Sequence, residues 1–175
     1  LILKMLLITK HLGDELAQNW DKVELNNLRQ LGGKNLLRLR DLCLRTVHTN
    51  SYGGEHTYDY YDFVTILEKI AAEFLSLAQF VSTKKTKKSA LFKKVSSLCD
   101  ELYSCYLKKD FNYSNAIWNK IRQGLKQKGD PENLPKTLRK ENPVILVYYY
   151  NMMQLLLHLS SRLVGLSIID SKEGK

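Results

Sequence analysis

One segment of this 175-residue chain carries apolar side chains at helical spacing over about five turns, and it limits the fold more than any other feature. The apolar positions recur in steps of three and four at Phe63, Ile66, Leu67, Ile70, Ala71, Phe74, Leu77, Ala78 and Val81. A helix with such a stripe must bury it against other helices. The stripe therefore predicts a helix over about 58–81 inside a helical bundle.

The same period continues through most of the chain. Helices are expected over about 3–18 and 22–48, with a kink or short break at Gly32-Gly33 in the second. Further stripes begin at Leu91, Ile117 and Ile145, and the last helix runs to about residue 167. With 9 glycines and only 3 prolines, the chain has too few turn residues for an all-β fold. The sequence predicts an all-α protein of about six helices.

Two long connections, "NSYGGEHTYDY" and "KGDPENLPKTLRKENP", each precede a long apolar helix. The helical stripes also align, with "LEKIAAEFLSLA" matching "LLHLSSRLVGLS". This repetition predicts two three-helix units in tandem, over 1–82 and 95–170, with a basic joint at 83–94 and a frayed tail at 171–175. The aligned core pairs are Leu67 with Leu156, Ile70 with Leu159, Phe74 with Leu163 and Leu77 with Leu166.

The chain has 27 Lys and Arg against 18 Asp and Glu, a net charge of +9. Such an excess favours an acidic partner, and nucleic acid, an anionic membrane surface and an acidic protein all meet that description. The joint carries Lys84, Lys85, Lys87, Lys88, Lys93 and Lys94, and the second helix adds a basic face with Arg38, Arg40 and Arg45. If both lie on one side, they form a polyanion or partner site. A solvated turn that keeps the protein soluble is the alternative reading.

No catalytic set or cofactor site emerges from the sequence. Cys43, Cys99 and Cys105 lack CxxC spacing and lie in helical stripes, so we expect buried thiols in a reducing compartment, the cytoplasm. The four histidines are scattered, and neither glycine pair has the context of a phosphate-binding loop. The apolar region 143–169 contains Asn151, Gln154, His158 and Arg162, which favours a bundle helix over a membrane span.

Two carboxylates, Glu68 and Glu73, interrupt the central stripe. They lie five residues apart, about 140° around a helix, so they do not converge on one cation. We expect solvated glutamates paired with lysines. Glu68 alone remains a weak candidate metal ligand.

Three segments, "LRDLCLRTVHTNSYGG", "YDFVTILEKIAAEFLSLAQF" and "PVILVYYYNMMQLLLHLSSRLVGL", resemble archaeal PhoU-like proteins, the phosphate-uptake regulator family. The resemblance spans about residues 28–166 and implies two three-helix bundles in tandem. It also implies an acidic metal-binding motif of spacing four in each repeat. Here those positions hold Glu68 with Ala72, and Leu157 with Ser161, so the implied metal site is lost. In archaeal relatives a small DNA-binding domain often precedes this region, and the initial Leu would fit a fragment or a stand-alone version.

The sequence and the resemblance together predict a non-catalytic regulatory or adaptor protein. It would act through protein contacts in phosphate uptake or related transcriptional regulation. The expected partner is a transporter component or a regulator, and a homodimer is left open. The alternative is a basic helical protein that binds nucleic acid or a ribonucleoprotein through the joint.

Overall fold

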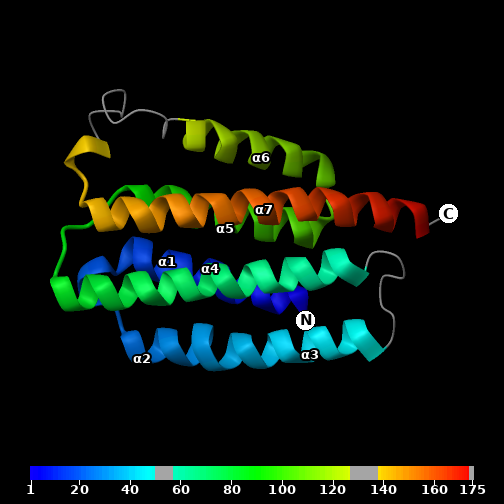
Figure 1. The fold of residues 1–175 in the computed structure, drawn as a ribbon, viewed down its shortest axis with the longest axis horizontal. Coiled ribbons are helices and arrows are strands. Elements are labelled where there is room, and N and C mark those ends of the chain that lie inside the picture. Colours follow the sequence, from blue (N-terminus) through cyan, green and yellow to red (C-terminus); the bar gives the residue numbers. More distant parts are fainter. Residues whose placement is uncertain (50–56, 127–137, 174–175) are drawn as a thin grey trace.

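The computed structural model describes residues 1–49, 57–126 and 138–173, and its helices lie side by side along one axis (Figure 1). Strands are absent from these residues, so the all-α prediction is confirmed. The α-helices are α1 (Ile2–Gln18), α2 (Leu25–Leu28), α3 (Leu36–Thr49), α4 (Thr57–Lys84), α5 (Leu91–Lys108), α6 (Phe111–Lys126) and α7 (Pro143–Glu173). Short helical turns are η1 (Trp20–Lys22), η2 (Arg29–Asn35) and η4 (Leu138–Lys140).

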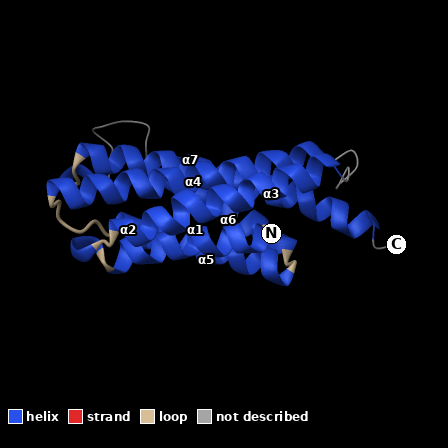
Figure 2. Ribbon diagram, turned by 90° about the horizontal axis from the view of Figure 1, so that it is seen from below, coloured by secondary structure: helices blue, strands red, loops and turns tan. Residues whose placement is uncertain are grey.

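Four helices form the centre of the bundle. Helix α1 packs against α5, and α4 packs against α7. Seen from below, α4 and α7 lie on one side of the bundle and α1 and α5 on the other (Figure 2). Helix α3 covers α1 and α4, whereas α6 covers α7 and α5. Each half of the chain thus supplies three mutually packed helices, and a single continuous core joins the halves. The boundaries between two units at 82 and 95 stay a prediction.

The stripe predicted over residues 63–81 is the interior face of α4. All nine of its apolar residues are buried. In α7 the aligned residues Leu156, Leu159 and Leu163 are buried as well, while the side chain of Leu166 lies outside the described part. Because α4 and α7 pack against each other, the two aligned stripes meet in one core.

The glycine pair does not break the second helix. Helices α2 and α3 are joined through η2, a π-helical segment, so residues 25–49 form one rod and the rods number six over the described residues. A side chain at Gly32 would place its Cβ only 2.8 Å from Cδ1 of Leu12. Glycine here permits the close approach of α1, and a π-helical segment stands where the short break was allowed for.

The ends of several helices differ from the sequence-based bounds. Helix α4 continues to Lys84 and α5 begins at Leu91, so the joint between them is shorter than 83–94. Helix α7 extends to Glu173, which removes most of the expected tail. The two predicted long connections fall largely on 50–56 and 127–137, outside the described residues. No described helix combines the length and the apolar character needed to cross a membrane.

Candidate functional site

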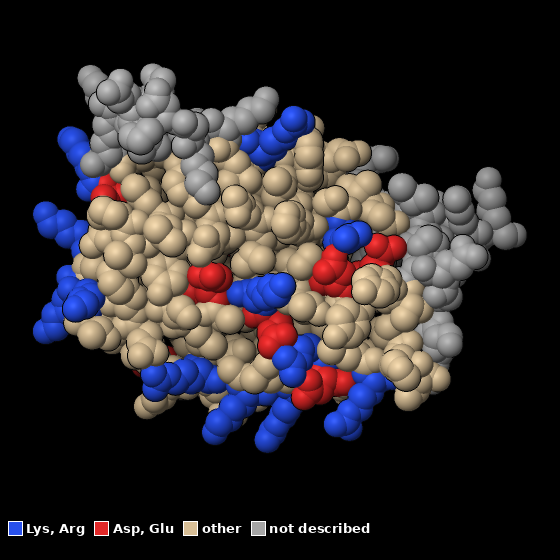
Figure 3. Space-filling model, in the orientation of Figure 1, with Lys and Arg blue, Asp and Glu red and all other residues tan. Residues whose placement is uncertain are grey.

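The lysine-rich joint lies at the end of the bundle where α4 stops and α5 starts (Figure 1). Lys84, Lys85 and Lys87 are exposed, and no described residue forms a hydrogen bond or ion pair with their side chains. Lysine and arginine side chains project from this end of the molecule (Figure 3). The joint is therefore a free cationic surface.

Two contacts fix the joint against the preceding half of the chain. The indole Nε1–H of Trp20 donates to the carbonyl of Thr86 at 3.0 Å, and the ring packs tilted on Phe92 at 5.5 Å. Lys88 donates from Nζ to the carbonyl of Gln18 at 3.1 Å. Gln18 ends α1, so this ammonium lies at the negative end of a helix dipole. Unlike the three free lysines of the joint, Lys88 is therefore engaged in a contact within the fold.

The predicted arginine face does not join the lysines in one surface. Arg45 lines a groove with Thr57 and Tyr61 at the start of α4, whereas Lys84 is the last residue of that helix. A helix of 28 residues is about 40 Å long, so these cations lie at opposite ends of the bundle. Arg38 is exposed on α3 between them. The nine residues predicted as one site are spread over the length of the molecule.

Arg40, from the same predicted set, is engaged within the fold. Its guanidinium binds Glu68 on α4 and Asp41 beside it, the latter at 2.7 Å. The hydrogen bond that Arg40 donates to Glu68, and then those that it donates to Asp41, raise the pKa of Arg40. The prediction that Glu68 pairs with a lysine is wrong, because α3 packs alongside α4 and brings an arginine to it.

Glu73 faces a different neighbour from Glu68. Its carboxylate accepts a hydrogen bond from Asn151 on α7 at 3.5 Å, on the other side of α4 from Arg40. The two glutamates thus point to different helices. Among the described residues, no three His, Cys, Asp or Glu side chains are grouped closely enough to hold a metal ion.

Replacing Glu68 by glutamine should lower the free energy of unfolding by less than about 1 kcal/mol, because the pair with Arg40 is partly solvated. Their side chains are 27% and 28% exposed. Urea unfolding at low and high salt measures the effect, which should shrink as salt screens the pair. Glu73→Gln is the matched control. A divalent cation that co-purifies with the unmodified chain and is lost from the Glu68 variant would contradict this assignment.

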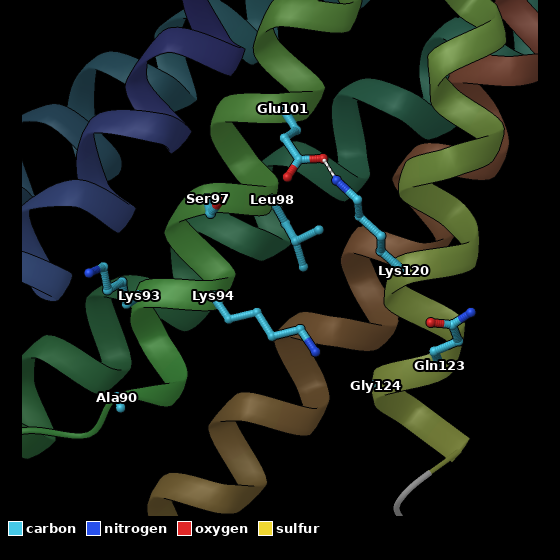
Figure 4. A pocket seen from close by; sticks show the side chains of 9 residues that line it. All are labelled: Ala90, Lys93, Lys94, Ser97, Leu98, Glu101, Lys120, Gln123 and Gly124. Carbon is cyan, nitrogen blue, oxygen red and sulfur yellow. Dashed lines mark hydrogen bonds and ion pairs between the residues drawn. The ribbon is translucent and has the colours of Figure 1, made fainter.

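A cleft of about 590 Å³ runs between α5 and α6 (Figure 4). Lys94 points into it from α5, while Lys120 on α6 reaches back to Glu101 with Nζ and Oε2 at 2.7 Å (Figure 4). The Tyr113 hydroxyl also donates to this Glu101 oxygen, at 3.1 Å. Glu101 is therefore paired twice, whereas Lys94 has no hydrogen-bond or ion-pair partner among the described residues.

In the neighbouring cleft between α1 and α5, Lys10 and two aspartates are paired, whereas Lys93 has no partner among the described residues. Lys10 contacts Asp14 at 2.9 Å and Asp100 at 3.4 Å, and Ser96 donates to the second oxygen of Asp14. Burial acts to raise the pKa of Asp14, but the hydrogen bonds from Ser96 and Lys10 outweigh it and lower the pKa. Each cleft therefore has one lysine without a partner among the described residues, but only the cleft between α5 and α6 lacks an aspartate in its lining.

The exposed strip of α7 is an uncharged surface. From Asn142 to Ser161 the sequence has no Asp, Glu, Lys or Arg. The strip consists of the exposed residues from Val144 onward in that range: Val144, Val147, Asn151, Gln154, His158 and Ser161. The face over α7 shows few charged side chains in Figure 3.

Comparison with models of known protein families, with curated proteins and with solved structures found no match to this chain.

Proposed function

We propose that this chain is a non-catalytic adaptor that acts by binding another protein through the exposed strip of α7. The observation that carries the proposal is the absence of Asp, Glu, Lys and Arg from the first 19 residues of α7, a helix whose outer side meets solvent. Charged side chains are depleted from the cores of protein interfaces, so this is the surface best suited to docking.

The composition of the strip supports a protein partner. Val147 is 58% exposed and Val144 is 43% exposed, and the half-buried Tyr148 and Leu155 extend the apolar surface beside them. Asn151 and Gln154 add hydrogen-bonding groups farther along α7. Exposed apolar groups interleaved with neutral polar groups match the centre of an interface better than a binding surface for a polyanion.

By the resemblance to PhoU-like regulators, we further propose that the partner belongs to phosphate transport or to its transcriptional control. We place the protein in the cytoplasm, because its three cysteines are free thiols.

Introducing a carboxylate into the strip should abolish docking. Val147→Asp is expected to reduce recovery of the partner about tenfold or more when the tagged chain is purified from its own cells, because an unpaired charge would be buried at the interface. Leu7→Asp is the matched control: it changes an apolar residue that is 49% exposed in the second turn of α1, far from α7. Equal loss with both variants, or undiminished recovery with Val147→Asp, would contradict the proposal.

Binding of nucleic acid through the joint is the second candidate function, favoured by the unpaired Lys84, Lys85 and Lys87. The same purification tests it, since RNA or DNA would be retained at low salt and released as salt rises. Replacing these three lysines by glutamine would then weaken retention, and Val147→Asp would not. A second copy of the chain on the strip is the remaining occupant, and sedimentation of the purified chain detects it.

A further inference from the structure

We propose that the cleft between α5 and α6 binds the phosphate group of a small phosphorylated molecule, held by Lys94 and Tyr149. The inference does not depend on the adaptor role, because the cleft and the exposed strip are different surfaces of the bundle. It rests on the charges, donors and size of the cleft.

The free positive charge in the cleft comes from Lys94. The charges of Lys120 and Glu101 are engaged with each other, so an entering anion would meet the Lys94 ammonium as its unpaired counter-ion. Ala90, at the N-cap of α5, also lines the cleft, so the positive end of an 18-residue helix dipole adds to the field. Lys93 lies on the rim and projects to the other side of α5 (Figure 4).

A second donor lies beside Lys94. A Cβ added at Gly124 would be 3.1 Å from Nζ of Lys94 and 3.7 Å from the Tyr149 hydroxyl oxygen. The Met153 Cε would lie closer still, at 2.9 Å, so this point is not itself the binding site. The Lys94 ammonium and the Tyr149 hydroxyl nevertheless both lie beside Gly124, at most about 7 Å from each other, which is within reach of two oxygens of one phosphate group. One oxyanion can accept a hydrogen bond from each of them.

Tyr149 is a buried phenol without a partner for its hydroxyl. The residue is only 4% exposed, and no described residue forms a hydrogen bond with its hydroxyl. Its ring is held edge-on by Phe92 at 6.5 Å and by Tyr150 at 5.4 Å. Burial, and then the neighbouring Tyr150, raises the pKa of Tyr149, so the hydroxyl stays protonated and able to donate at neutral pH. The hydroxyl oxygen itself is not fully enclosed, so a ligand oxygen can reach it and accept its hydrogen bond.

The remaining walls suit a small molecule with a tetrahedral anionic group. Lys94 on α5 and the amide of Gln123 on α6 line the cleft, and the Tyr149 hydroxyl on α7 lies beside Gly124 of its wall, so the donors come from three helices rather than from one plane. Such a spatial arrangement fits phosphate better than a planar carboxylate. Ser97 adds a hydroxyl and Leu98 an apolar contact for the organic part. A volume of about 590 Å³ is within the usual range of small-molecule sites.

Titration calorimetry with glycerol phosphate tests the site, with glycerol and succinate as comparison probes. We expect glycerol phosphate to bind and to raise the melting temperature, glycerol not to bind, and succinate to bind at least about tenfold more weakly. Lys94→Gln should weaken binding of glycerol phosphate about tenfold or more, because a charge-assisted hydrogen bond is lost. Tyr149→Phe keeps the ring and should weaken binding about threefold to tenfold.

Lys84→Gln is the matched control, because it removes the same charge from the joint outside the cleft, and it should change the dissociation constant less than about twofold. An equal loss with Lys84→Gln, equal binding of succinate, or no binding of glycerol phosphate would overturn the proposal. Random RNA is the last ligand to test, as a competitor of glycerol phosphate. The assignment to a small molecule fails if RNA displaces glycerol phosphate and Lys94→Gln weakens RNA binding more than it weakens binding of glycerol phosphate. The cleft would then be a site for a polymer.

Discussion

Replacing Phe74 by alanine should lower the free energy of unfolding by about 3–5 kcal/mol. Phe74 is 1% exposed on α4, and its Cζ would lie 3.2 Å from a Cβ added at Gly13 on α1. The Cα of Ser96 on α5 would lie 3.4 Å from the same added Cβ. The ring therefore fills the place where three central helices converge, and its removal leaves a cavity that the neighbouring backbones cannot close.

Denaturant unfolding followed by circular dichroism measures this loss. Tyr58→Ala is the control on the same helix, since Tyr58 is 84% exposed, and it should change stability by less than about 0.5 kcal/mol. A loss below about 1.5 kcal/mol for Phe74→Ala would mean that the three helices do not pack around this ring.

All three thiols should react slowly with thiol reagents in the folded protein. Burial first, and then the charges of Asp14 and Asp100, raises the pKa of Cys99 to about 12. Burial, followed by the charge of Asp110, raises that of Cys105 to about 11, and burial raises that of Cys43 as well. At pH 8 only about one Cys99 in ten thousand is then a thiolate, against about one in ten for an ordinary thiol near pKa 9.

Labelling with a chromogenic disulfide reagent at pH 8 measures the reactive thiols. We expect a rate about a thousandfold or more below that of an exposed cysteine, and three equivalents only after denaturation. Ser82→Cys supplies the control, because residue 82 is exposed on α4 near the joint lysines. A native thiol that reacts as fast as this introduced cysteine would contradict the burial of the three cysteines.

The periodic parts of the fold were predictable from the sequence for a physical reason. In α4, each side chain between Phe63 and Val81 is placed by local helix geometry, so spacing alone identifies the buried face. The burial of the three cysteines follows from the same argument. The break that the glycine pair allowed for does not occur, because a neighbour decides the outcome: Gly32 lies against Leu12, and a π-helical segment continues the helix through this contact.

The surfaces were less predictable, because they depend on which helices meet. Glu68 has an arginine partner 28 residues away, and Arg40 was therefore removed from the set expected to bind a polyanion. Tyr149 lies in an apolar stripe and looks like any core aromatic in the sequence. Only packing brings it to Lys94 and Gly124, from three different helices. Lys120 was missed for the same reason.

The placement of the two tryptophans gives the molecule a pair of native optical probes. Trp20 donates to the carbonyl of Thr86, so its emission should respond to displacement of the segment between α4 and α5. Trp118 lies on α6 with the guanidinium of Arg122 4.9 Å from its ring centroid, so it should respond to movements of that covering helix. Variants that keep one indole at a time would separate the two signals. Movements of the segment between α4 and α5 and of α6 could then be followed without any attached dye.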